Sequence, residues 1–477
     1  MFESINAKRR RFARRRHPIT LNPKPFSLRN RSSRAHQAKF ITGLLVITFA
    51  SQAVPAQEKS SPPLKGVNAE IIGMLRAQQQ PTQTQGKKSI TLNDAVSIFL
   101  QRNLQLVAAR YDIEMAEADK LTARLRPNPA FDASFEDLPT DFSGKFFKEQ
   151  EIAYGISQTF ELGGKRSRRI GVANANADLA RAQFEATVWQ LTNDLKRKFY
   201  AVVLAQSLLK LSNENQTTFE ETLKHSNELY QLGEISGLDL RRLEVEKLKF
   251  DTDVANSQRD YEVALRDLRV TLGGDYQATD VDVAGALDYQ PYQFSLGDLR
   301  DKSLAARPDL KAAQISERAA DSEIRLQDSL RVPDVSVGVG LKRVVVDNVY
   351  SFGIGISLPI FDRNQGERVK ALTQKKRAQN DQRIIANQIL SDVDKALAAY
   401  EIQKKRVELY RTGVLTKVDD IMSLTEFSLR AGEGSTLDLL DAIRTRRETL
   451  AAYYQTLFDY QMSLLDLELA TATPLQK

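Results

Sequence analysis

The sequence predicts a mainly α-helical protein with a smaller β part, built from two copies of one structural unit. Three observations predict this fold class. A set of residues recurs about 200 positions later, short segments alternate between apolar and polar residues, and long segments carry apolar residues at helical spacing. Because one unit is duplicated, helices and strands have to be placed as two equivalent halves.

The repeat is specific at two places in the chain. Residues 91–129 recur without a gap at an offset of 204, so that Thr91 matches Ser295 and Pro129 matches Pro333. Residues 233–240 return at an offset of 199 as residues 432–439. We therefore expect a first repeat at 90–289, a second at 290–473 and a short tail at 474–477, each repeat with a helix, a β-hairpin and a long helical hairpin.

The basic character of the chain belongs to its first residues. Residues 1–39 carry twelve Lys and Arg against the single acid Glu3, so this segment holds +11 while the whole chain is +7 and the rest is −4. An uncharged run from Phe40 to Ala50 and the small residues before Gln57 follow. This order predicts a basic leader and signal peptide at 1–56, hence export, although a basic disordered tail is the alternative. Residues 57–89 are expected to be a flexible segment.

Strands are expected after Pro129 and after Pro333, where apolar and small polar residues alternate. One β-hairpin in each repeat makes four strands in total. An ordinary soluble hairpin fits this pattern, but the runs approach the roughly 9 to 11 residues that a tilted strand needs to cross a bilayer. The residues expected to face lipid are Ile152, Tyr154, Ile156, Val335, Val337, Val339, Phe352, Ile354 and Ile356.

Four strands cannot close a barrel on their own, and an open edge in hydrocarbon leaves backbone amides unpaired at several kcal/mol each. Association of chains is therefore required if these strands lie in a membrane.

Two very long helices are expected, from about 166 to 230 and from about 367 to 429, followed by partner helices at 238–272 and 437–470. Soluble coiled-coil rods carry the same pattern. Each long helix stops at the glycine-containing repeat, where Gly233 and Gly432 suit helix C-terminal caps and Ser236 and Ser435 suit the start of the next helix. The chain thus forms two antiparallel helical hairpins with tips far from the strands.

These features together resemble the TolC-type outer-membrane efflux family. The resemblance rests on residues 92–129, on Gln158 to Arg166, on the strand end 356–362 and on the two tip motifs, and it spans about 90–473. The segment from Gln158 to Arg166 is most similar to the subfamily that serves cobalt, zinc and cadmium efflux pumps.

The resemblance implies a homotrimer with a 12-stranded β-barrel in the outer membrane of a Gram-negative bacterium, continued by a long α-helical tunnel through the periplasm. It implies outer-membrane lipid, a periplasmic adaptor protein and an inner-membrane proton-driven pump of the RND type as partners. It implies no enzyme activity and no cofactor. Adaptor contact is implied for the helical tips, at Gly233, Glu234, Ser236, Asp239, Gly432, Glu433 and Ser435.

The family also implies an acidic ring at the periplasmic entrance, which here falls on Asp438 and Asp441, three residues apart on one helix face. Six carboxylates from three chains would attract cations. Acids in the first turns of a helix are equally favoured by its dipole without any transport role. The sequence departs from TolC at Leu429 and Gly434, where TolC has an aromatic and a basic residue that close the entrance, and Arg430 is the candidate replacement.

The sequence gives little support for metal binding, catalysis or nucleic-acid binding. His225 is the only histidine beyond the leader and the chain has no cysteine, so we expect neither a metal site nor disulfides nor a hydrolase triad. The acidic balance outside the leader gives no indication of nucleic acid as a partner.

The leading hypothesis is therefore a passive outer-membrane channel of a tripartite efflux system, which exports heavy-metal cations and thereby serves heavy-metal resistance. A conduit for organic compounds or secreted polypeptides is the alternative within the fold. A periplasmic coiled-coil scaffold is the alternative from another class.

Overall fold

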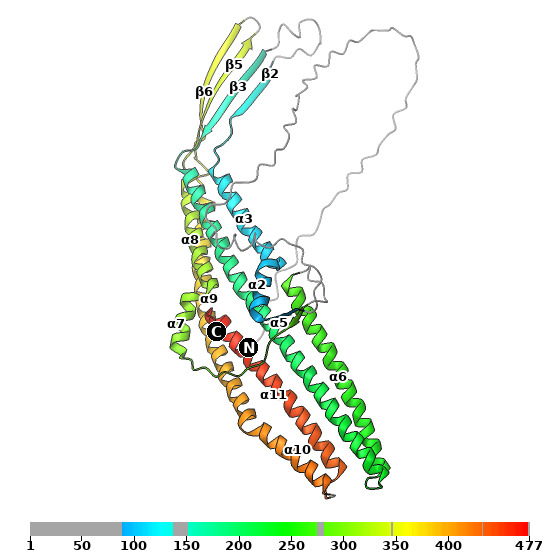
Figure 1. The fold of residues 1–477 in the computed structure, drawn as a ribbon. Helices are drawn as coiled ribbons and strands as arrows, with labels where there is room; N and C mark the ends of the chain where they lie inside the picture. The colour runs from blue at the N-terminus through cyan, green and yellow to red at the C-terminus, as the bar shows by residue number, and fades with distance from the viewer. Residues whose placement is uncertain (1–87, 137–150, 274–280, 345–346, 432, 476–477) are drawn as a thin grey trace, which may run out of the picture. The chain divides into compact units, whose positions relative to one another are not determined.

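The computed structural model describes residues 88–136, 151–273, 281–344, 347–431 and 433–475, all of them within one compact unit, 73–477. The predicted leader at 1–56 and residues 57–87 lie outside the described residues. Helices and strands follow one another as two equivalent series, as the repeat predicted (Figure 1).

The first series begins with α2 (Leu92–Arg102) and α3 (Leu104–Arg124) and continues through the strands β2 (Ala130–Glu136) and β3 (Glu151–Phe160). It ends with the hairpin of α5 (Lys165–Gln231) and α6 (Gly237–Leu272). The 67 residues of α5 correspond to a rod of roughly 100 Å at the helical rise. The predicted helix bounds are therefore confirmed to within a residue or two.

The second series repeats this order with α7 (Leu296–Ala306), α8 (Pro308–Ser329), β5 (Val335–Val344) and β6 (Asp347–Ile356). Its long helical arm is α9 (Gln365–Leu409), a π-helical turn (Tyr410–Val414) and α10 (Leu415–Arg430), and α11 (Thr436–Thr471) returns beside it. The π turn interrupts what the sequence predicted as one helix. Gly413 lies inside this turn, where it supplies no side chain for packing.

The four strands form one antiparallel sheet in the order β2-β3-β5-β6. Each strand continues into a helix of the rod, and the helices α3, α5, α8 and α9 lie beside one another in the same order as the strands. Sheet and helices thus form one continuous layer, seen in Figure 1 with the strands at one end and the hairpin tips at the other.

A small parallel sheet not expected from the sequence joins β1 (Lys88–Ile90) to β4 (Val281–Val283). Ile90 and Val283 are buried in the main core beside Phe99, Phe199 and Leu268. Because β1 starts at Lys88, the predicted boundary between the flexible segment 57–89 and the first repeat falls inside this strand. Three-residue strands are too short to show an alternating pattern.

The connection between the two series runs as an extended strap over the second hairpin. The hydroxyl of Tyr400 accepts from Tyr292 N at 2.7 Å and donates to Tyr292 O at 3.0 Å. The hydroxyl of Tyr460 donates to Gln290 O at 2.5 Å. These buried tyrosines satisfy the strap's backbone polar groups, so the strap fixes α9 against α11.

Candidate channel surfaces and helical tips

The sheet has one apolar face, and the register places every strand residue predicted to face lipid on it. Ile156 lies opposite Phe131 and Val339, and Val339 lies opposite Phe352. Directly opposed residues point to the same side of a sheet. The same face carries Ile152, Tyr154, Val335, Val337, Ile354 and Ile356.

This apolar face is strongly exposed in a single chain. Phe352 is 69% exposed and Ile354 63%, although both lie within a paired strand. Soluble monomers rarely leave so continuous an apolar surface in water. The face therefore requires an apolar environment.

The opposite face of the sheet carries small and polar side chains. Gly155 lies opposite Gly340, and Gly340 lies opposite Ser351. A Cβ at Gly340 would come within 2.6 Å of the Ser351 hydroxyl, so the neighbouring strands leave no room for a larger residue there. Lys342 pairs with Glu136 at 2.8 Å and Glu151 at 2.5 Å on this face. Such a thin, polar face suits a water-filled lumen.

The strand-to-helix joint after β3 is held by ion pairs between charged residues. The Lys165 ammonium is buried and lies 2.7 Å from Asp334 Oδ1 at the start of β5. Arg169 binds both oxygens of Glu161, at 2.6 and 3.1 Å. It also donates to Leu125 O, beyond the C-terminus of α3. The segment from Glu161 to Arg169 therefore connects the strands β3 and β5 with the helices α3 and α5.

At the first helical tip, Gly233 adopts a positive φ of 80° after the end of α5, as expected for a C-terminal cap. Ser236 is the N-cap of α6, and its side chain accepts from Asp239 N at 3.1 Å. Arg242 pairs with Asp239 at 3.2 Å. Glu234 and Ser236 are exposed, so the turn itself is available for contact.

At the second tip, Ser435 and Asp438 form a reciprocal capping box at the start of α11. The Asp438 carboxylate accepts from Ser435 Oγ at 2.7 Å and from Ser435 N at 3.2 Å. Asp441 lies one turn further along, and both aspartates are exposed. Asp438 therefore stabilises the helix start, and it remains accessible to ions.

The remaining tip residues show how tight this turn is. A Cβ on Gly434 would come within 2.9 Å of Leu429 N, so a side chain at this position requires the backbone to shift. Glu433 and Ser435 are exposed. Gly432, which was also predicted to belong to the tip, and the side chain of Arg430 lie outside the described residues.

The two hairpins are held together behind their tips by an ion pair between the buried Glu246 and the half-exposed Arg444. Glu246 on α6 is 2% exposed, and Arg444 on α11 binds both of its oxygens, at 2.9 and 2.5 Å. The hydrogen bonds from Arg444 lower the pKa of Glu246 from 4.5 to about 2. Phe219, Leu243, Phe250 and Leu440 pack beside this pair as a shared core.

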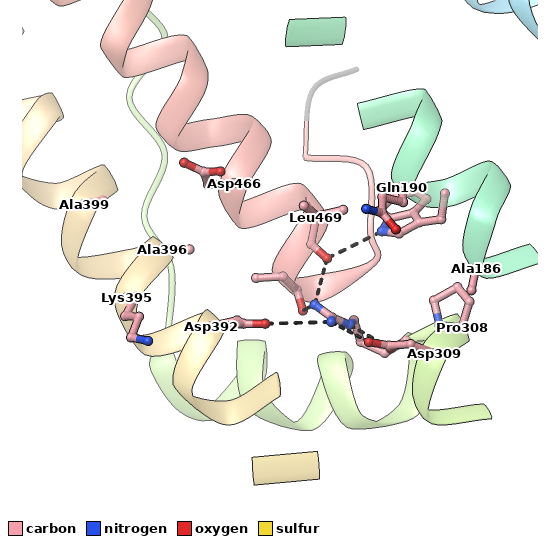
Figure 2. A pocket seen from close by; sticks show the side chains of 13 residues that line it. Ala186, Gln190, Pro308, Asp309, Asp392, Lys395, Ala396, Ala399, Asp466 and Leu469 are labelled. Atoms are coloured by element: carbon pink, nitrogen blue, oxygen red, sulfur yellow. Dashed lines mark hydrogen bonds and ion pairs between the residues drawn. The ribbon is translucent and has the colours of Figure 1, made fainter. Parts of the chain in front are cut away.

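A pocket of about 590 Å³ lies where α5, α8, α9 and α11 meet (Figure 2). Arg307 pairs there with Asp309 at 2.6 Å and donates to Leu469 O at 3.2 Å, near the end of α11. Figure 2 shows these interactions as dashed lines, with Asp392 approaching from α9. Arg307 thus binds carbonyl groups at the C-terminal end of α11, and Asp309 and Asp392 pair with its guanidinium group.

Two features of the described ranges concern metal binding and the crossing of a membrane by helices. Within them, no group of three or more His, Cys, Asp or Glu side chains is placed to hold a metal ion. Nor does any helix among the described residues combine the length and apolar character needed to cross a membrane.

An open sheet with one apolar face, continued by long helical hairpins, defines the class of outer-membrane channel proteins. Residues 95–274 and 299–473 match the outer membrane efflux protein family, and the chain belongs to this family. It is therefore an outer-membrane efflux protein and not an enzyme, as the resemblance implied.

Relatives and solved structures agree with this assignment. The chain is 27% identical over 360 residues to the cobalt-zinc-cadmium resistance protein CzcC of Cupriavidus metallidurans, covering 75% of this chain and 84% of that protein. It is 25% identical over 323 residues to the nickel-cobalt-cadmium resistance protein NccC of Alcaligenes xylosoxydans xylosoxydans, covering 66% and 69%.

Among solved structures, CusC superposes with a TM-score of 0.67 at 17% identity, covering 82% of this chain and 95% of that one. The open state of the MtrE channel of Neisseria gonorrhoeae superposes with a TM-score of 0.66 at 20% identity, covering 83% and 96%. The predicted TolC-like fold is confirmed.

Proposed function

We propose that three copies of this chain form a 12-stranded barrel in the outer membrane and a helical tunnel below it, and that heavy-metal cations leave the cell through this channel. The observation that carries the proposal is the open sheet. Its edge strands β2 and β6 are each paired on one side only within the described chain, and its apolar face is exposed. When copies join edge to edge in lipid, the edge strands gain hydrogen-bonding partners and the apolar face is no longer exposed to water.

The orientation of the sheet follows from its two faces. We assign the apolar face to lipid and the glycine and serine face to the lumen, because a barrel of this type is apolar outside and polar inside. The two repeats, 90–289 and 290–473, then contribute two strands each, so that each repeat supplies one sixth of the barrel wall. The helical hairpins extend into the periplasm.

The tips of the hairpins are the proposed contact with the other components of a tripartite system. A periplasmic adaptor would bind the exposed turns around Glu234 and Glu433, and an inner-membrane proton-driven pump would supply the energy. The capped, accessible helix starts at Ser236 and Ser435 support this assignment, because a side-chain cap fixes where each helix begins beside the exposed turn.

Metal cations are the proposed cargo on two grounds. CzcC and NccC, to which this chain is similar, are named for resistance to cobalt, zinc, nickel and cadmium. The exposed carboxylates of Asp438 and Asp441 suit a cation entrance when three copies bring six of them around one axis.

The trimer is tested with engineered cysteines, because the native chain has none. Ser134→Cys on β2 and Gly353→Cys on β6 should be joined between chains by a long bismaleimide, giving dimers and trimers on a denaturing gel. The matched control pair, Lys210→Cys and Arg259→Cys on helices, should give far less of both. A purified chain that stays monomeric without detergent would contradict the proposal.

The cargo is tested in a strain that lacks the gene. We expect higher sensitivity to cobalt, zinc or cadmium, restored by the wild-type gene. Unchanged metal sensitivity together with increased sensitivity to organic compounds would favour the alternative conduit and leave the channel assignment standing.

A further inference from the structure

The four points where strands meet helices lie side by side at one end of the sheet. Residues 124–130, 160–169, 328–334 and 357–368 make these junctions. The pairing of Phe160 with Val335, and of Val335 with Ile356, brings the strand ends into one row. We call these four segments the junction collar.

The junction collar has a positive net charge, although the chain beyond residue 39 has a negative one. It holds nine Lys and Arg against five Asp and Glu, a net charge of +4, whereas the chain beyond residue 39 carries −4 as a whole. Three copies of the chain would place three such collars around the barrel.

The acids of the junction collar are largely engaged inside it. Asp334 pairs with Lys165, Glu161 with Arg169, and Asp328 with Arg368 at 2.6 Å. Five exposed arginines form no ion pair with any described residue: Arg124, Arg126, Arg168, Arg331 and Arg363. Arg363 donates its Nε to Ile360 O at 3.4 Å, which leaves its two terminal amino groups available. Its terminal amino groups and the other four guanidinium groups can therefore bind an external anion.

Exposed apolar residues accompany these arginines. In the loop after β6, Leu358 is 71% exposed and Phe361 92%, and Leu125 beside Arg124 and Arg126 is 64% exposed. Apolar side chains next to arginines are typical of a segment at the boundary between hydrocarbon and headgroups.

The strand length places the junction collar at this boundary. Strands β3, β5 and β6 have 10 residues each. At about 3.3 Å per residue and a tilt of about 40° they span about 25 Å, which matches the apolar band of outer-membrane barrels. The helix-side end of each strand therefore lies at the level of the headgroups of the inner leaflet.

We propose that the junction collar binds anionic phospholipid headgroups of the periplasmic leaflet and thereby fixes the depth of the barrel in the outer membrane. This inference rests on the proposed placement of the sheet in lipid. Guanidinium groups are well suited to the task because they bind phosphate oxygens in a bidentate way.

The test measures binding of fluorescently labelled phosphatidylglycerol to the detergent-solubilised protein, with phosphatidylcholine as the neutral comparison. The wild type should bind phosphatidylglycerol preferentially, and the preference should vanish at about 1 M salt, where the screening length is about 3 Å. Each arginine near an anionic surface contributes about a fivefold factor. The triple variant Arg126→Gln, Arg168→Gln, Arg331→Gln should therefore bind about a hundredfold more weakly.

A matched triple variant removes exposed basic residues far from the junction collar: Lys210→Gln, Arg259→Gln and Arg266→Gln. Their ion pairs are surface pairs, so this protein should fold and bind phosphatidylglycerol as the wild type does. If the collar variant fails to fold, the salt dependence of the wild type decides the matter.

Four results would overturn the proposal: equal binding of both lipids, a salt-independent preference, full competition by inorganic phosphate, or collar variants that lose the trimer while keeping lipid preference. In each case the protein would still require detergent. A protein that needs no detergent would instead overturn the placement of the sheet in a membrane.

Discussion

Asp438 serves two physical purposes at one position. Its carboxylate closes the capping box with Ser435, which by itself explains an acid at the third residue of a helix. Asp239 occupies the same capping position in the first hairpin and also binds Ser236. The pair is therefore a built-in comparison, because only Asp438 is proposed to face the entrance.

We expect the double variant Asp438→Ala, Asp441→Ala to lose cation preference in planar bilayers, or to conduct more, because six carboxylates leave the proposed entrance. Loss of the cap should also cost about 1 kcal/mol. Asp239→Ala removes the acid at the corresponding position, which accepts from Ser236 Oγ, and should leave selectivity unchanged. Identical currents in all three proteins would remove the acidic ring from the proposal.

Glu246 makes the stability of the fold depend on pH. Its pKa is about 2 in the folded chain against 4.5 as the ordinary value, so its ionised form stabilises the fold by about 3 kcal/mol above pH 4.5. This contribution is lost as the pH falls from about 4.5 toward 2. Glu246→Gln should show a smaller drop of the thermal transition between pH 6 and pH 3 than the wild type, measured by circular dichroism.

The control for this measurement is Asp419→Asn, which removes an acid whose side chain is 61% exposed and paired with Arg446. An exposed pair contributes little to stability. The control should therefore follow the wild-type pH profile, and a Glu246→Gln profile that also follows it would show that the buried pair is not what titrates.

At the scale of elements, the joint between β3 and α5 decides how the strands meet the rods. Gly163 and Gly164 both have positive φ, at 69° and 73°. They differ in their surroundings. A Cβ on Gly163 would lie 2.7 Å from the Val332 side chain, whereas a Cβ on Gly164 would meet nothing within 4 Å.

Gly163→Ala should therefore destabilise the protein more than Gly164→Ala. Both substitutions place a side chain in the left-handed region, at about 1 kcal/mol. Only the first also pushes against Val332, which sits in the turn before β5. The thermal transition of the purified protein measures the difference. Equal losses for both variants would mean that the joint yields to the extra methyl group.

At the scale of the whole molecule, the two faces of the sheet decide where the protein resides. Gly353 and Ile354 are neighbours on β6 and point to opposite faces. A lysine substituted at each position therefore tests whether that face of β6 lies in lipid or in the water-filled lumen.

Ile354→Lys should reduce the amount of trimer in the outer membrane, because a lysine on the lipid face between mid-depth and the headgroups costs about 1 to 2 kcal/mol. Gly353→Lys should insert normally and lower the conductance, since its ammonium would project into the proposed lumen. Heat-resistant trimer on gels and single-channel currents measure the two effects. The opposite pattern would exchange the two faces.

Much of the whole fold was predictable because its signals are periodic and long. The repeat, the strands after Pro129 and Pro333 and the hairpin ends at Gly233 and Ser435 were all predicted within a few residues. Long elements accumulate evidence over many turns, and caps mark their ends with specific residues. The sequence did not predict the short strands β1 and β4, the π turn, or the strap that packs on Tyr400 and Tyr460. These features have no periodic pattern of apolar residues.

The sequence by itself determined the class of protein. Strands with alternating apolar and polar residues and long helices with apolar residues at helical spacing are local patterns, and both occur in each of the two repeats. Only the tertiary structure decided which charges meet. Glu246 and Arg444 are 198 residues apart, and Lys165 and Asp334 are 169 apart. Pairing over such sequence distances depends on which helices and strands pack side by side. Local patterns of apolar and polar residues do not specify these neighbours.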